Sequence, residues 1–219
     1  MKPLLIYCYD AYCGWCYGFS PVMKTLAIDF RSICQFEVLS GGMILPDKPV
    51  HISVTAEYIA RAYPTVEIST GVKFGEDYLW HIRNPAESDW FPNSEKPAIA
   101  LCVLKEIFPD RQVEIASGLQ YALHFEGRDL TDDEAYRQLI KDFEVDEFEF
   151  YQKLRSEEYK AKAYEEFELV KRFQVNGYPT LMMQADETKF YLITRGYTNY
   201  EATRDVIDKV LITLTSKYR

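Results

Sequence analysis

Two cysteines near the N-terminus have the spacing of a reversible dithiol. Cys13 and Cys16 stand in the segment Tyr12-Cys13-Gly14-Trp15-Cys16. Residues three apart on a helix lie on the same face, so the two sulfurs can form a disulfide without moving the backbone. A thiolate attacks a disulfide sulfur, and a second thiol then displaces the first. The pair therefore indicates thiol–disulfide exchange, with Cys13 as the nucleophile and Cys16 as the resolving thiol.

The surrounding sequence places this pair where a strand meets a helix. Residues 4–9 form a short apolar run that is typical of a buried strand. Residues 13–31 follow, with apolar side chains at three- and four-residue steps. Cys13 then lies at the helix N-terminus, where unpaired N–H groups and the helix dipole stabilise a thiolate. Cys16 lies one turn further in and is expected to be more buried.

Two carboxylates are candidates for accepting the proton of Cys16. Asp10 lies just before the cysteine pair, and Glu37 follows the first helix. Functional sites often place a carboxylate near a reactive group, where it can accept a proton. An ordinary structural role is the alternative for both residues, and Asp10 is the stronger candidate.

A metal site and a structural disulfide are the alternatives for the cysteine pair. A structural zinc site needs two more ligands, but Cys8, Cys34 and Cys102 are isolated and the histidines show no paired spacing. A structural disulfide across so short a loop would constrain the unfolded chain very little. A redox pair fits the strand–helix context better. We therefore expect no metal, and we expect the remaining three cysteines to be small buried hydrophobes.

The composition limits which binding partners and which cell compartment we expect. The chain has 219 residues with 25 basic and 34 acidic side chains, a net charge of −9. This charge argues against nucleic acid and anionic membranes as partners. No targeting segment and no run of eighteen apolar residues is visible, so we expect no membrane span and a cytoplasmic protein. Thiols are mostly kept reduced in that compartment.

The elements follow one another in the order βαβ, a helical block, then ββα. A second strand is expected at 34–40, further strands at 181–184 and 190–194, and a last helix at 199–217. Helical patterns lie between the two strand regions, separated by breakers such as Pro64. They cover residues 51–63, 74–83, 97–108, 111–126, 131–142 and 147–173. Thr131 and Ser94 are the expected N-caps of two of these helices.

This order resembles the thioredoxin fold. The resemblance rests on the C-x-x-C segment at the first helix and on Gly177-Tyr178-Pro179-Thr180 before the third strand. The helical block resembles the DsbA-like branch, and the whole chain resembles the cytoplasmic FrnE-type disulfide oxidoreductases. The resemblance implies an α/β fold with a central mixed sheet and a large helical insertion. It also implies a discontinuous thioredoxin-like domain at 1–43 and 172–219, with the inserted helical domain at 44–171.

The resemblance further implies how substrate binds. Pro179 would be cis and lie against the dithiol, and the Tyr178 backbone would offer an edge to a substrate strand. An ordinary trans turn is the alternative. Tyr12, Trp15 and Tyr178 would contribute to an aromatic rim for an uncharged substrate. Tyr17 is a further rim candidate, and Tyr17 and Phe19 are otherwise core residues.

Two departures from the family pattern affect the expected activity. Tyr178 replaces the Val or Thr that relatives commonly carry before the proline, and its bulk can restrict access or stack on an aromatic substrate. The pair Gly14-Trp15 lacks the histidine of the strongly oxidising periplasmic members. We therefore expect a couple less oxidising than theirs, between thioredoxin and the periplasmic oxidants.

Two rival functions use the same scaffold. Kappa-class glutathione transferases and 2-hydroxychromene-2-carboxylate isomerases share the helical block, but they typically carry one Ser where this chain has Cys13. A non-catalytic polypeptide-binding module is the second rival. The expected partner is a thiol or disulfide substrate, protein or small molecule, with no cofactor and with glutathione as a possible co-substrate. Both a monomer and a homodimer fit, and the direction of exchange stays open.

Overall fold

A four-stranded mixed sheet forms the centre of the protein. The structure is a computed structural model that describes residues 2–186 and 188–216. Its strands are β1 (Leu4–Tyr9), β2 (Gln35–Ser40), β3 (Thr180–Gln184) and β4 (Phe190–Arg195), in the spatial order β2-β1-β3-β4. β1 pairs in parallel with β2, and the β1–β3 and β3–β4 pairs are antiparallel. The mixed sheet predicted from the sequence is confirmed.

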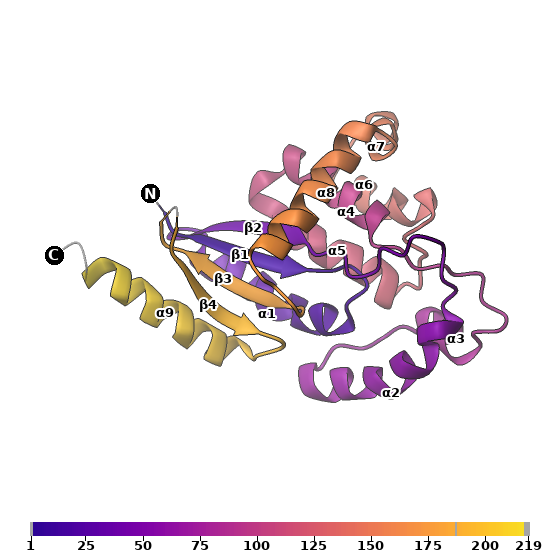
Figure 1. The fold of residues 1–219 in the computed structure, drawn as a ribbon, viewed down its shortest axis with the longest axis horizontal. Helices are drawn as coiled ribbons and strands as arrows, with labels where there is room; N and C mark the ends of the chain where they lie inside the picture. The colour runs from indigo at the N-terminus through magenta and orange to yellow at the C-terminus, as the bar shows by residue number, and fades with distance from the viewer. Residues whose placement is uncertain (1, 187, 217–219) are drawn as a thin grey trace.

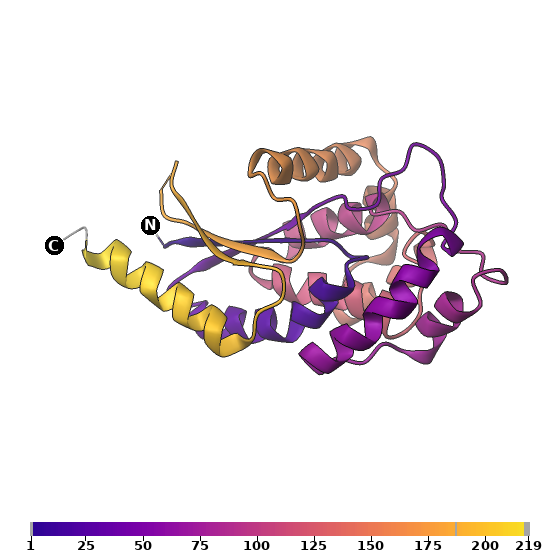
Figure 2. The same ribbon diagram turned by 60° about the horizontal axis from the view of Figure 1, so that its bottom comes forward.

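Helices cover both faces of this sheet. Helices α1 (Gly14–Phe30) and α9 (Tyr200–Ser216) lie on one face, and α8 (Glu157–Arg172) lies on the other (Figure 2). Side chains of β1 alternate accordingly: Tyr7 and Tyr9 join the core on the α1 side. Ile6 and Cys8 pack with Val170 of α8. The predicted end of the last helix, Lys217, lies outside the described residues.

The remaining helices form a block at one end of the sheet (Figure 1). They are α2 (Ser53–Thr70), α3 (Glu76–Arg83), α4 (Glu95–Ile107), α5 (Gln112–His124), α6 (Arg137–Asp142) and α7 (Glu147–Leu154), with short 3₁₀ turns η1 (Pro109–Arg111) and η2 (Asp133–Tyr136). They stand between the βαβ and ββα parts of the chain, as the resemblance implies. Among the described residues, no helix is both long and apolar enough to cross a membrane.

Two helix boundaries predicted from the sequence are wrong. Helix α2 continues through Pro64 to Thr70 and ends at Gly71, whose φ of +79° is the left-handed conformation that favours glycine. The buried side chains of Ala56 and Val66 hold the helix on either side of the proline. The segment predicted as one helix over 147–173 is two, because Ser156 caps α8 by accepting a hydrogen bond from the backbone N of Tyr159.

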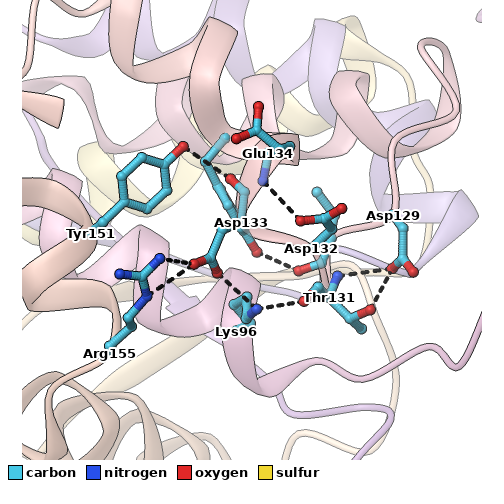
Figure 3. A network of polar contacts seen from close by, with 10 residues as sticks. Lys96, Asp129, Thr131, Asp132, Asp133, Glu134, Tyr151 and Arg155 are labelled. Carbon is cyan, nitrogen blue, oxygen red and sulfur yellow. Dashed lines mark hydrogen bonds and ion pairs between the residues drawn. The ribbon is translucent and has the colours of Figure 1, made fainter. Parts of the chain in front are cut away.

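The predicted capping role of Thr131 is also wrong. Its hydroxyl donates to Asp129, 2.8 Å away, and the cap of η2 is Asp132, which accepts the N–H of Glu134. Figure 3 shows how this acidic loop is held: Asp133 accepts hydrogen bonds from Lys96 of α4 and from Arg155 after α7. The side chains of the loop thus join two helices of the block.

Helices α5 and α8 also cover the free edge of β2. The backbone N–H of Val38 donates to the Gln112 side chain at 2.9 Å, and that of Ser40 donates to Glu166 at 2.9 Å. Lys105 forms ion pairs with both Glu166 and Glu37. An edge strand with satisfied N–H groups does not template further pairing, and these contacts fix α5 and α8 to the sheet.

Candidate active site

Cys13 is the N-cap residue of α1. Its backbone is extended, with φ −80° and ψ 107°, and its sulfur accepts the backbone N–H of Cys16 at 3.2 Å. This sulfur therefore takes the place that a Ser or Asp oxygen has at most helix starts. It lies at the positive end of the α1 dipole, which favours negative charge on the sulfur.

The two thiols differ in accessibility. Cys13 keeps 6 % of its surface exposed, whereas Cys16 is completely buried. Burial raises the pKa of Cys16 well above its ordinary value, and the hydrogen bond with Cys13 and its charge add to the increase. The backbone N–H of Asp10 acts in the opposite direction. Cys13 is thus the sulfur that a substrate can reach, and Cys16 is a protonated partner behind it.

Asp10 is a buried carboxyl held by donors on both oxygens. Oδ1 accepts the Tyr12 N–H and the Ser94 hydroxyl, each at 3.0 Å, and Oδ2 accepts the Met43 N–H at 2.7 Å. Burial raises the pKa of Asp10, and these three hydrogen bonds act against the increase. Ser94 is the N-cap residue of α4, as predicted, but its hydroxyl is used for Asp10 and makes no bond to the helix backbone.

A segment from the far end of the chain completes the site. The Tyr178–Pro179 peptide bond is cis, as the resemblance implies. The carbonyl oxygen of Tyr178 lies 3.7 Å from the Cys13 sulfur and can accept its S–H. The Tyr178 phenol turns away and donates to the Gly41 carbonyl at 2.9 Å. The Tyr178 backbone therefore faces Cys13, while its ring is fixed on Gly41.

The structure does not bring all of the aromatic candidates into the predicted rim around the dithiol. Tyr17 is buried, stacks on His124 and donates to the Lys73 carbonyl, so it belongs to the core. Phe19 is likewise fully buried. Tyr12 is half-buried with its hydroxyl inside the protein. Trp15 is half-buried beside the ring of Tyr197, with ring centroids 6.2 Å apart.

Helix α5 of the inserted block supports the turn before Cys13. The Asp10 carbonyl accepts both the Cys13 N–H at 3.1 Å and the side-chain amide of Gln120 at 3.3 Å. Gln120 is completely buried. No local pattern in the sequence indicates this contact, because it joins residues 110 positions apart.

Glu37 and the remaining cysteines lie outside this arrangement. Glu37 pairs with Lys105 at 2.6 Å and is adjacent to Ile6 on the face of the sheet opposite α1, so its geometry does not suit a proton acceptor for Cys16. Burial raises the pKa of Cys8 to about 12 and that of Cys34 to about 11, which keeps these thiols protonated. Within the described ranges, no group of three His, Cys, Asp or Glu side chains could hold a metal ion.

Three solved structures resemble this chain over nearly its whole length. A candidate protein disulfide isomerase from Nitrosomonas europaea shares 25% identity and a TM-score of 0.84, over 97% of this chain and 99% of that one. The cytosolic disulfide reductase DsbM from Pseudomonas aeruginosa shares 21% identity and a TM-score of 0.74, over 96% and 99%. A 2-hydroxychromene-2-carboxylate isomerase shares 10% identity and a TM-score of 0.63, over 98% and 97%.

No protein-family model matches the sequence, and no curated protein matches it. The relationship of this chain to known proteins therefore rests on its architecture and on the likeness to these solved structures. A four-stranded mixed sheet, a helical insertion and a cis-proline beside a helix-capping cysteine occur together here. By these features the chain is a DsbA-like thioredoxin-fold protein.

Proposed function

We propose that the protein is a thiol–disulfide oxidoreductase in which Cys13 attacks and Cys16 resolves. The observation that carries this proposal is the environment of the Cys13 sulfur. It caps α1, accepts the Cys16 N–H at 3.2 Å and stands 3.7 Å from the Tyr178 carbonyl. An inert buried cysteine would not need this position at a helix start.

The exchange proceeds in two balanced steps. The Cys13 thiolate attacks one sulfur of a substrate disulfide, so a Cys13–substrate bond forms and the substrate S–S bond breaks. The Cys16 thiol then loses its proton and attacks Cys13, so the Cys13–Cys16 disulfide forms and the Cys13–substrate bond breaks. The released substrate thiolates take up two protons. Two electrons move from the protein dithiol to the substrate, and the reverse sequence oxidises a dithiol.

The backbone beside Cys13 supports a peptide-like substrate. The Tyr178 carbonyl faces the dithiol, and an extended substrate segment can pair with such an edge. We propose that Trp15 and the Tyr178–Pro179 segment contact this substrate, with Tyr12 acting mainly as support for the turn. Asp10 remains our candidate for receiving the proton of Cys16, because it is a buried carboxyl in the turn before the dithiol, and its backbone carbonyl accepts the Cys13 N–H at 3.1 Å.

Glutathione is the proposed small-molecule co-substrate. One solved structure of the Pseudomonas aeruginosa DsbM is described with GSH, at 21% identity and a TM-score of 0.73. That protein is also described as a cytosolic disulfide reductase. By this likeness we propose a cytoplasmic site of action in which the protein works as a reductase.

The rival activity is a glutathione-dependent isomerisation, which is supported by the likeness to 2-hydroxychromene-2-carboxylate isomerase. That likeness shows the fold alone. The isomerase mechanism has no step for a second thiol, whereas Cys16 here lies directly behind Cys13.

The variant Cys16→Ser separates the two activities. With insulin or glutathione disulfide as substrate, we expect this variant to accumulate a mixed disulfide on Cys13, detected by mass spectrometry of the intact protein. Cys13→Ser should form no adduct, and Cys34→Ala, at a buried cysteine remote from the site, should turn over like the unaltered protein. Failure of Cys16→Ser to trap substrate, with isomerase activity retained, would reject the oxidoreductase.

A further inference from the structure

Two buried tyrosine hydroxyls lie beneath the dithiol, and the exchange steps described for Cys13 and Cys16 do not use them. Tyr7 and Tyr9 of β1 are 1 % and 0 % exposed. Within the part of the chain that the structure describes, neither hydroxyl has a hydrogen-bond partner of normal geometry. A buried polar group without a partner destabilises the fold by about 1–3 kcal/mol. A hydroxyl in this state can donate to a stronger acceptor that forms beside it.

The geometry of β1 and α1 directs Tyr7 toward Cys16. Tyr7 and Tyr9 are two residues apart on the strand face that packs on α1, and their ring centroids lie 5.7 Å apart. The Tyr7 ring meets Phe19 edge-on at 6.0 Å. Phe19 is one helical turn beyond Cys16, so the two share a face of α1. The buried Tyr7 ring therefore lies under the turn that carries the resolving thiol.

Electrostatics at the phenol agree with this placement. Burial raises the pKa of Tyr7 well above its ordinary value, and the charge of Cys16 and a polar contact with its side chain contribute to the increase. For Tyr9, burial and the charge of Asp10 come first, and a polar contact with Ser40 acts against the increase. Tyr7 thus stays protonated throughout the working range and keeps a hydrogen to donate.

We propose that Tyr7 is a positioning residue whose hydroxyl donates a hydrogen bond to the Cys16 thiolate during resolution. This inference rests on the proposed thiol–disulfide exchange and adds one residue to it. When Cys16 loses its proton, the sulfur becomes a strong acceptor, and Tyr7 supplies the missing partner. The thiolate then attacks Cys13, the Cys13–substrate bond breaks, and the departing substrate thiolate takes up a proton from solvent. Tyr7 itself neither gains nor loses a proton.

The other charged and titratable groups near Tyr7 and Cys16 cannot take the donor role proposed for Tyr7. They are Asp10 and Cys13 in the turn, Tyr9 of β1 and Tyr178 before β3. The carboxylate of Asp10 adds negative charge and so opposes a Cys16 thiolate. The Tyr178 hydroxyl is committed to Gly41. The Tyr7 ring packs on Phe19, one turn from Cys16, and its hydroxyl has no competing hydrogen-bond partner among the described residues.

Reaction with the disulfide of 5-thio-2-nitrobenzoate tests this inference in the full chain. Attack by Cys13 releases one coloured thiolate, and resolution by Cys16 releases a second, so one stopped-flow trace reports both steps. For Tyr7→Phe we expect an unchanged first phase and a second phase slower by about tenfold or more, because hydrogen bonds to charged groups are the strong ones. The second phase should also require a higher pH.

Tyr9→Phe is the matched control, since it removes the neighbouring unpartnered hydroxyl from the same strand face. Both of its phases should stay within about twofold of the unaltered protein, in line with the small effect of a hydroxyl without a partner. A Tyr7→Phe second phase equal to that of the unaltered protein would overturn the inference, and so would equal slowing of both phases. Absence of the first phase in the unaltered protein would instead reject the proposed function.

A measurement that keeps Tyr7 in place covers the case in which Tyr7→Phe does not fold. With Cys13 blocked by carboxamidomethylation, the ¹³Cζ resonance of Tyr7 is followed while Cys16 is titrated. A shift that coincides with thiolate formation at Cys16, larger than that of Tyr9, supports the hydrogen bond. A Tyr7 resonance that does not respond to the Cys16 titration contradicts it.

Discussion

The backbone N–H of Cys16 donates a hydrogen bond to the sulfur of Cys13, with 3.2 Å between the two atoms. The same contact caps helix α1 and brings the two cysteines of the pair together. The stability of the helix start and the reactivity of the thiol therefore depend on one interaction. Substitution of the residues that hold this arrangement in place should change stability, exchange or both.

Gly41 leaves room for the ring of Tyr178. A Cβ added at Gly41 would lie 2.1 Å from Cζ of Tyr178, so the ring must move and give up its 2.9 Å hydrogen bond to the Gly41 carbonyl. We expect Gly41→Ala to lower the free energy of unfolding by about 1–3 kcal/mol, as overpacking does. Exchange should slow by about tenfold, because the Tyr178 carbonyl shifts away from Cys13 and a misplacement of about 1 Å can reduce rates a hundredfold.

The steric control for this variant is Gly177→Ala, where an added Cβ meets no atom within 4 Å. Urea unfolding and insulin reduction measure the two effects. Equal unfolding midpoints for the Gly41→Ala and Gly177→Ala variants would show that the Tyr178 ring is not held against Gly41.

Ser94 fixes Asp10 beneath the turn. Its hydroxyl donates to Oδ1 of Asp10 and accepts the Ile44 N–H, each at 3.0 Å. Ser94→Ala leaves the Ile44 N–H without its partner, so we expect a loss of about 1–3 kcal/mol in urea unfolding. Ser117→Ala is the matched control, because the buried Ser117 hydroxyl bonds only within α5, to the Val113 carbonyl. A loss for Ser94→Ala no greater than for Ser117→Ala would contradict the structural role of Ser94.

His124 makes stability depend on pH. It is buried among the rings of Tyr17, Phe74 and Tyr78, and burial lowers its pKa from 6.5 to about 3. Between these pH values the unfolded chain binds a proton that the folded protein does not. The folded state therefore loses about 1.4 kcal/mol per pH unit through His124 as the pH falls across this window, and it keeps this stability above pH 6.5.

The variant His124→Phe should remove that contribution, since an aromatic ring replaces the imidazole in an aromatic cluster. Urea unfolding of both proteins at several pH values from about 7 to about 4 measures the difference in slope. Parallel pH profiles for the two proteins would show that His124 is not buried in its neutral form.

The positive charge of Lys105 balances two carboxylates where the helices meet the sheet. It pairs with Glu37 at 2.6 Å and with Glu166, which in turn accepts the Ser40 N–H of β2. Lys105→Met leaves Glu166 buried and unpaired, and we expect a loss of about 3 kcal/mol in the free energy of unfolding. Adding Glu166→Gln should restore part of it. Exchange activity should not change, and a loss of activity in the folded variant would contradict the separation of this cluster from the dithiol.

The sequence was sufficient to locate the dithiol and the order of elements around it. Strong local signals explain this success: an apolar strand, a helical period and a C-x-x-C segment all lie within the first helix and the strand before it. The cis state of Pro179 agrees with what the family resemblance implies. The domain boundaries at 43/44 and 171/172 stay a prediction.

The misplaced features have two kinds of cause: a contact with a distant residue in the case of Ser94, and a competing local contact in the case of Thr131, whose hydroxyl bonds to Asp129. Ser94 lies 84 residues from Asp10, and no local pattern tells that its hydroxyl will be used there instead of at the α4 start. Pro64 is tolerated inside α2, although proline normally ends a helix. Tyr7 could have been found, because residues two apart in a strand share a face and Tyr7 and Tyr9 must both meet the helix that carries Cys16.

The most direct test of the central claim is a redox titration against glutathione, with free thiols alkylated and counted by mass spectrometry. The chain has five cysteines, all free in the structure. We predict that two thiols, Cys13 and Cys16, are lost together, with a potential between about −270 mV for thioredoxin and about −120 mV for the periplasmic oxidant. Five alkylated cysteines at every glutathione ratio would contradict the account, as would a potential equal to that of the periplasmic enzyme.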